Sequence, residues 1–250
     1  MPHLVDMDVY SLKRRALPFA VLVILLILPR LSEAQKPDLS DYRKPASPPA
    51  PAFNPPTDAK TKFGEALFFD NRLSGANTIS CATCHIPKFT WTDRRQFSLG
   101  ETGEPRPRRT PPLQDVGWNQ LFARDGRIET LEGFILGPIS HSKEMNQNLD
   151  LLSEELTGIP LYPPLFRAAF GNTTITLDGI TQSLASYVRS LRSSSSVFDA
   201  WVNGDNTALS GAAMAGFGLF TGKAGCVTCH SGWRFSDQKF HDIGLITKDY

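Results

Sequence analysis

The chain has 250 residues, of which 41% are apolar and 20% are charged, a composition typical of a globular protein and not of a disordered chain. Its 26 Lys and Arg residues almost balance its 25 Asp and Glu residues, which excludes a protein built to bind polyanions such as nucleic acids. Only four cysteines are present, too few for a disulfide-stapled scaffold of this length.

The N-terminus has the pattern of a secretory signal peptide. The basic residues Lys13, Arg14 and Arg15 precede an apolar core over residues 16–29, and small residues follow at Ser32 and Ala34. The apolar core is shorter than the roughly 18 residues that span a bilayer, so we expect cleavage after residue 34 and export to the periplasm. The alternative is an uncleaved signal that acts as a membrane anchor.

The next segments define the expected domain organisation. Residues 35–56 are rich in proline, which predicts a stiff, extended linker. From residue 57 to residue 193 we expect a first helical domain that starts with a short helix carrying Phe63, Leu67 and Phe68. Within this domain, the apolar residues of the segment 86–127 show no clear helical or strand periodicity.

Two further helices are predicted nearer the C-terminus. Thr176 is a suitable N-cap for apolar residues at 3.6-residue spacing from Leu177 to Leu191. The serine run 193–196 ends that pattern and marks the expected domain boundary, so that residues 194–250 form the second domain. A helix from Ser210 through Phe220 follows. Because no long alternating pattern occurs, the fold class is expected to be mostly α with long loops.

All four cysteines fall in two copies of one motif, Cys-x-x-Cys-His. The first is Cys81, Cys84 and His85, and the second is Cys226, Cys229 and His230. This motif attaches c-type haem: the two thiols bond to the haem vinyl groups, and the histidine binds the iron. The sequence therefore predicts two covalently bound c-type haems.

Three other uses of the cysteines compete with haem attachment. A single four-cysteine zinc site would leave both histidines as coincidences. A redox-active Cys-x-x-Cys requires a βαβ context, which this sequence lacks. Two structural disulfides remain possible for an exported protein.

The chemistry of each haem depends on its sixth iron ligand. An iron with two strong axial ligands transfers electrons, whereas an open sixth position binds small oxidants. No histidine occurs between residues 86 and 140, which favours an open position at the first haem. Candidate ligands elsewhere are His141, Met145, Met214, His241 and Tyr250. Peroxide cleavage also needs a proton carrier, and Glu144 supplies a carboxylate in a loop that Pro138 is expected to fix.

The chain resembles the bacterial di-haem cytochrome c peroxidases and their MauG-like relatives. The matching stretches are Gly64–Ser74, Ile79–Ser80, Asp125–Arg127, Leu131–Glu132, Gly137–Pro138, Glu144–Met145 and Gly222–Gly225, together with both haem motifs. The resemblance covers residue 57 to the end of the chain. Each stretch is short, but the combination is specific.

The resemblance implies two cytochrome c-like helical domains whose haems face a shared interface. The haem on His85 would be the peroxidatic one, and the haem on His230 would receive electrons from a small cytochrome c or cupredoxin. By position, Glu144 matches the distal acid–base glutamate of the family, and Pro138 matches its distal-pocket proline. Since family members continue well beyond the second motif, the second domain is expected to be incomplete in this sequence.

The chain departs from the family pattern at several positions. Arg124 replaces the tryptophan that often lies between the haems, and Phe134 stands at the place of a distal glutamine. Arg109 stands where many members have an asparagine near a calcium ion, and a cation there opposes Ca²⁺ binding. Trp91 and Trp118 are possible electron relays, although core packing is the more common role of tryptophan.

Three functions follow as hypotheses. The leading one is a di-haem peroxidase that reduces hydrogen peroxide to water. The second is a MauG-like enzyme that oxidises residues of a partner protein. The third is a non-catalytic di-haem electron carrier, which would require six-coordinate iron at both sites.

Overall fold

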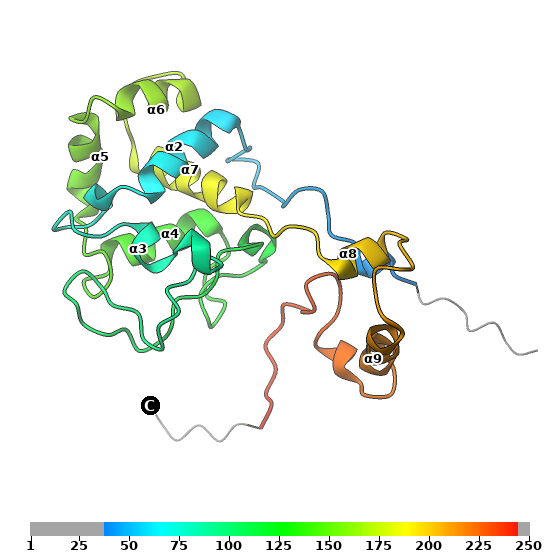
Figure 1. The fold of residues 1–250 in the computed structure, drawn as a ribbon. Coiled ribbons are helices and arrows are strands. Elements are labelled where there is room, and N and C mark those ends of the chain that lie inside the picture. The colour runs from blue at the N-terminus through cyan, green and yellow to red at the C-terminus, as the bar shows by residue number, and fades with distance from the viewer. Residues whose placement is uncertain (1–37, 245–250) are drawn as a thin grey trace, which may run out of the picture. The chain divides into compact units, whose positions relative to one another are not determined.

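The structure, a computed structural model, describes residues 38–244 and is shown in Figure 1. Within this part the backbone forms helices and loops, with isolated bridges and no strand, so the expectation of a mostly α fold is confirmed. The expected export signal, residues 1–34, lies outside the described residues.

The α-helices of the described residues are α2 (Asp58–Phe68), α3 (Cys81–Cys84), α4 (Leu131–Ser140), α5 (Leu149–Thr157), α6 (Tyr162–Phe170), α7 (Leu177–Ser190), α8 (Val197–Val202) and α9 (Gly211–Thr221). Short 3₁₀ turns are η1 (Ser40–Tyr42), η2 (Asn71–Leu73), η3 (Pro87–Phe89), η4 (Val116–Trp118) and η5 (Cys226–Thr228).

Helices α7 and α9 begin directly after Thr176 and Ser210, as the sequence predicts, and α2 contains the predicted Phe63, Leu67 and Phe68. The Thr57 side chain accepts a hydrogen bond from the Lys60 amide, and the Thr176 side chain accepts one from the Gly179 amide. Ser210 caps α9 in the same way. Each cap satisfies one of the amides that a helix N-terminus leaves without an internal partner.

Helix α2 packs against α7, and this contact is the centre of the core formed by α2, α4, α6 and α7 (Figure 1). Phe63, Leu67, Ile180 and Leu184 are almost completely buried in this core. The two backbones touch at Gly64, where an added Cβ would lie only 1.9 Å from the Ser183 carbonyl oxygen. A glycine is therefore required for this close approach.

Helix α6 extends the same core with aromatic side chains. The ring of Phe63 meets the rings of Tyr162 and Phe166 edge-on, with centroids 5.8 and 5.7 Å apart. Such edge-to-face contacts add to the stability that burial already gives. Helices α5 and α6 were not predicted from the sequence.

A buried polar network fixes part of the proline-rich segment. Glu132 on α4 accepts hydrogen bonds from Arg189 on α7 at 2.6 and 3.0 Å and from the Asn54 amide at 2.6 Å. Asn54 also accepts a bond from Lys60 at 3.0 Å, and its side chain is 1% exposed. Asn54, within the segment predicted as an extended linker, is therefore packed into the first domain.

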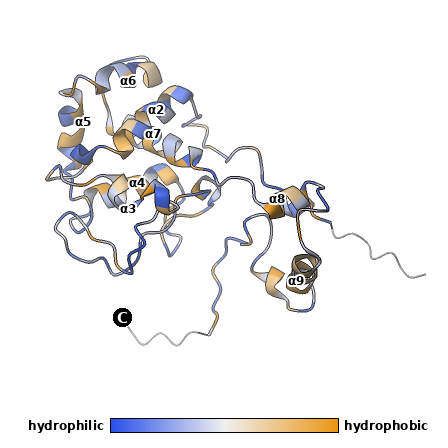
Figure 2. Cartoon of the chain, viewed as in Figure 1, coloured by the Kyte–Doolittle hydropathy of each residue, from blue (hydrophilic) through white to orange (hydrophobic). Residues whose placement is uncertain are grey.

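Helices α8 and α9 gather around Tyr42 of η1. The Tyr42 ring lies 5.0 Å from Phe217, 5.7 Å from Phe235 and 6.1 Å from Phe198, measured between centroids. Helix α9 is apolar along most of its length (Figure 2), yet only Phe217 is buried. Among residues 38–244, no helix combines the length and the apolar character that crossing a membrane requires.

Candidate haem sites and the acid beside the first motif

The first Cys-x-x-Cys-His motif forms a short helix with its histidine at the C-terminal end. Cys81 and Cys84 lie one turn apart on α3, and the Ser80 and Thr83 side chains cap its start. Burial raises the pKa of the Cys81 thiol to about 12 and also raises the pKa of Cys84. Both sulfurs are therefore held as neutral thiols near pH 7.

The imidazole of His85 is oriented by a backbone carbonyl. Its Nδ1 lies 2.9 Å from the Trp91 oxygen, which leaves Nε2 as the nitrogen that can bind iron. Burial lowers the pKa of His85, partly offset by the Trp91 and Pro111 carbonyls and by Asp93. A neutral imidazole with a fixed Nδ1–H is the form in which histidine binds a metal.

The second motif repeats this arrangement with different residues. Cys226 begins η5, and the His230 amide donates to the Cys226 carbonyl at 3.0 Å, as the His85 amide donates to Cys81 at 2.9 Å. The Nδ1 of His230 lies 3.1 Å from the Phe235 oxygen. In both motifs a backbone carbonyl five or six residues after the histidine accepts a hydrogen bond from Nδ1 and leaves Nε2 free to bind iron. The residues present therefore fit a c-type haem at each site.

The alternative uses of the cysteines find no support in the geometry. All four cysteines are free thiols. Within residues 38–244, no three His, Cys, Asp or Glu side chains come together as a possible metal site, so the two motifs do not form one zinc site.

Glu144 lies in the loop after α4. Pro138 lies inside α4 and not in the loop where the sequence analysis placed it. Its carbonyl accepts from the Met145 amide at 3.1 Å and so folds the loop back onto the helix end. The Glu144 carboxylate accepts a hydrogen bond of 2.6 Å from Arg106, a residue that the sequence analysis did not select.

The segment 98–101 connects Glu144 with the first motif. The Leu99 carbonyl accepts a weak hydrogen bond from the Cys84 thiol at 3.7 Å, and the Glu101 amide donates to the Glu144 carbonyl at 2.8 Å. Between them, an added Cβ on Gly100 would lie 1.9 Å from the Lys143 oxygen. Glu144 is also near enough to raise the pKa of Cys84 by charge repulsion, as Asp93 does, although burial has the larger effect. The structure thus brings Glu144 into the neighbourhood of Cys84.

Comparison with known proteins decides the family. The family model for di-haem cytochrome c peroxidases matches residues 58–207. The chain belongs to the di-haem cytochrome c peroxidase family. Members of this family carry two c-type haems, which agrees with the two motifs.

Individual members of the di-haem peroxidase family show the same relationship. The chain is 47% identical over 205 residues to the methylamine utilization protein MauG of Methylorubrum extorquens, and the match covers 82% of this chain and 58% of that protein. It is 34% identical over 236 residues to the cytochrome-c peroxidase IdrP1 of Pseudomonas sp. (strain SCT), covering 93% of this chain and 62% of the relative.

A solved structure gives the same fold. A crystal structure of a MauG-like protein associated with microbial copper homeostasis superposes with a TM-score of 0.72 at 31% identity, over 83% of this chain and 61% of that one. The chain therefore spans about three fifths of the length of these three family members.

The candidate sixth ligands that lie within the described residues have other partners or surroundings. Met145 is buried in the hydrophobic core, and His141 lies at the surface 3.4 Å from Arg106. His241 pairs with Asp237 at 2.8 Å, and Met214 is 37% exposed on α9. Tyr250 lies outside the described residues.

The residues that depart from the family pattern also have defined places. Phe134 stacks on Phe122 with centroids 6.3 Å apart, and the Arg124 guanidinium donates to the Arg109 carbonyl at 3.4 Å. Trp91 packs between Phe68 and Tyr187, at centroid distances of 5.7 and 6.2 Å. Its side chain thus packs in the core while its carbonyl orients His85.

Proposed function

We propose that this chain provides the peroxide-reducing centre of an exported di-haem peroxidase. In this proposal residues 57–193 hold one haem through Cys81, Cys84 and His85, and residues 194–250 belong to the domain that holds the other through Cys226, Cys229 and His230. The export signal over residues 1–34 directs the protein to the periplasm. A small cytochrome c or cupredoxin supplies the electrons.

The bound haems would supply iron that exchanges single electrons and, where an axial position is open, accepts peroxide. The chain's own residues supply the rest. Reduction of H₂O₂ takes up two electrons and two protons, breaks the O–O bond and yields two waters. The Glu144 carboxylate takes the proton from the attacking oxygen atom of peroxide and delivers it to the departing oxygen.

The observation that carries this proposal is the link from Glu144 through residues 98–101 to Cys84. Arg106 holds the carboxylate by a charge-assisted hydrogen bond, and Pro138 folds the loop through its carbonyl. Pro138 therefore acts on Glu144 through the backbone and not by contact with peroxide.

Glu144→Gln tests the assignment, because glutamine keeps the shape of the side chain and loses its proton-carrying ability. We expect peroxide turnover to fall by about 10²–10⁴ with two haems still attached. Glu104→Gln is the matched control, since Glu104 is an exposed acid of the neighbouring loop that pairs with Lys143. Equal turnover in the Glu144→Gln and wild-type proteins would refute the role of Glu144.

A MauG-like reaction is the second candidate, and the 47% identity to MauG favours it. In that case the same haem centre would oxidise residues of a partner protein instead of accepting electrons from a small donor. Turnover with reduced cytochrome c, compared with peroxide-dependent oxidation of candidate partner proteins, separates the two. The Glu144→Gln substitution should slow either reaction, because both begin with peroxide cleavage.

A further inference from the structure

A cavity beside the second haem motif contains a cation without a counter-ion. The cavity has a volume of about 400 Å³, and its lining includes Lys44, Asp115, Ser193, Trp233, Arg234 and Phe235. These residues come from segments far apart in the sequence. No haem-attachment residue and no part of the Glu144 loop lines it.

The two cations of this cavity differ in their partners. Lys44 donates to both oxygens of Ser193 at 2.6 and 2.8 Å and lies 3.0 Å from the Asp115 carboxylate, which satisfies its three donors. Asp115 is in turn bonded by the Ser193 amide at 3.1 Å and by its hydroxyl. The Lys44–Asp115–Ser193 cluster is therefore neutral and fully hydrogen-bonded.

Arg234 has no such arrangement. Its Nη1 is buried and has no hydrogen-bond partner, and no carboxylate of residues 38–244 lies within ion-pair distance of it. Burial lowers the pKa of Arg234, against the attraction of the more distant Asp115. The residue as a whole is only partly buried, but its Nη1 is removed from water without a hydrogen-bond partner, so an anion in the cavity would satisfy a donor and a charge that the described residues leave unpaired.

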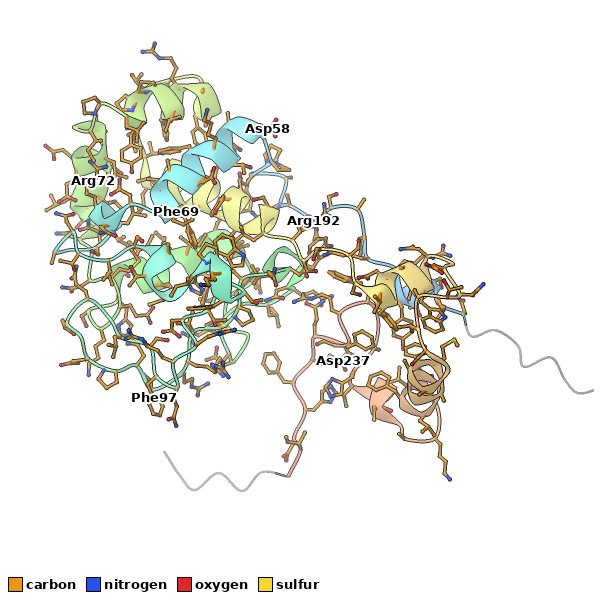
Figure 3. The ribbon with its side chains drawn as sticks, viewed as in Figure 1. Asp58, Phe69, Arg72, Phe97, Arg192 and Asp237 are labelled. Atoms are coloured by element: carbon orange, nitrogen blue, oxygen red, sulfur yellow. The ribbon has the colours of Figure 1, made fainter. Side chains whose placement is uncertain are left out.

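The indole of Trp118 has a second orphaned donor in the same region. Its Nε1 is buried without a partner, and its ring meets Trp233 edge-on with centroids 4.9 Å apart. Two cations lie over the Trp118 ring, each 5.6 Å from its centroid: Lys44, already named, and Arg192, which follows α7 and is labelled in Figure 3. The surroundings of Arg234 thus combine positive charge with unused hydrogen-bond donors.

The loop that carries Arg234 is hydrogen-bonded to His230, the histidine of the second motif. Phe235, the next residue, accepts the hydrogen bond from His230 Nδ1, and its amide donates to the Gly232 carbonyl at 2.9 Å. The Asp237 amide closes the same loop onto the Cys229 carbonyl at 2.9 Å. Arg234 therefore extends from the loop that orients the imidazole.

We infer that Arg234 binds a carboxylate in this cavity, and that this carboxylate is a propionate of the haem attached at Cys226, Cys229 and His230. The inference rests on the proposed function, since it requires that haem. A haem carries two propionates on the edge opposite its thioether-linked edge, and a guanidinium binds a carboxylate through two parallel hydrogen bonds. Propionate binding would neutralise the partly buried charge of Arg234 and give its buried Nη1 a hydrogen-bond acceptor.

The test uses the holoprotein with Arg234→Gln, Arg234→Lys and the control Lys223→Gln, which removes an exposed charge just before the second motif. Haems are first counted by the pyridine haemochrome method. We expect Arg234→Gln to lower the reduction potential of the second haem, because an uncompensated propionate stabilises the ferric state. Lys223→Gln should leave that potential unchanged.

Infrared difference spectra with isotope-labelled haem propionates read the carboxylate directly. The propionate band should shift in Arg234→Lys, because lysine keeps the charge but loses the paired hydrogen bonds. This variant gives a result even if Arg234→Gln fails to retain its haem. Two haems with unchanged propionate bands and potential would overturn the inference and leave the proposed function standing. A potential that responds to added acetate in the wild type and not in Arg234→Lys would also overturn it, since the carboxylate would then come from outside. Fewer than two haems in the wild type would instead refute the proposed function.

Discussion

The Arg106 guanidinium donates a hydrogen bond of 2.6 Å to the Glu144 carboxylate, and the two side chains are 20% and 31% exposed. Arg106 is itself held by its amide, which donates to the Ser98 carbonyl at 2.7 Å. The pair therefore ties the loop after α4 to the segment that contacts Cys84. It gives Glu144 one defined orientation beside the first motif.

Arg106→Gln should reduce peroxide turnover by about tenfold to a hundredfold, the equivalent of losing one charge-assisted hydrogen bond. Because Arg106 positions Glu144 and does not touch peroxide, the loss should appear in kcat more than in KM. The double variant with Glu144→Gln should be no slower than Glu144→Gln alone. Steady-state kinetics on the four proteins measures this coupling, and additive losses would show that Arg106 acts independently of Glu144.

Gly64→Ala should destabilise the protein by about 1–3 kcal/mol, because the new Cβ would press on the Ser183 carbonyl and push α2 away from α7. Gly216→Ala is the control: it lies within α9, and nothing lies within 4 Å of its added Cβ. Alanine there should stabilise by about 0.5–1 kcal/mol through helix propensity. Urea denaturation of both variants tests the contrast, and a neutral or stabilising effect at Gly64 would contradict the close packing.

Glu132→Gln should destabilise the protein by about 3–5 kcal/mol, because it leaves Arg189 buried without its counter-ion. The two side chains are only 8% and 9% exposed. Asp125→Asn breaks the Asp125–Arg127 pair, whose side chains are 59% and 67% exposed, and should change the urea midpoint little. Similar midpoints for the two variants would show that burial does not strengthen the Glu132–Arg189 pair.

The sequence predicts the helices whose signals are local. Thr176, for example, is both a cap and the start of a periodic apolar pattern, so α7 could be placed from sequence alone. The haem motifs are equally local, because the two cysteines and the histidine of each motif fall within five residues. The geometry at both motifs agrees with that interpretation.

Other parts of the site depend on contacts between distant residues. Arg106 meets Glu144 across 38 positions, and Asn54 meets Glu132 across 78, so no short pattern reveals either pair. A proline-rich segment resembles a free linker unless the buried partner of Asn54 is known. Arg234 follows a motif residue closely, yet its lack of a counter-ion appears only after folding has placed Asp115 with Lys44.

Two carboxylates predict how stability depends on pH. Burial alone would raise the pKa of Glu132, but the hydrogen bonds from Arg189 and Asn54 outweigh it and hold that pKa below its usual value. Ser193 and Lys44 lower the pKa of Asp115 in the same way, against burial. A carboxyl whose pKa is lower in the folded state contributes stability that is complete above its unfolded pKa and is lost as pH falls through the folded pKa. Because of these two groups, the urea midpoint should change little between about pH 7 and 5. It should then decrease as the pH falls below about 4.5, near the unfolded pKa of Glu.

Glu132→Gln removes one of the two groups, so the urea midpoint of this variant should fall less steeply with acid than that of the wild type. Parallel curves for the two proteins would mean that Glu132 does not contribute to the acid dependence.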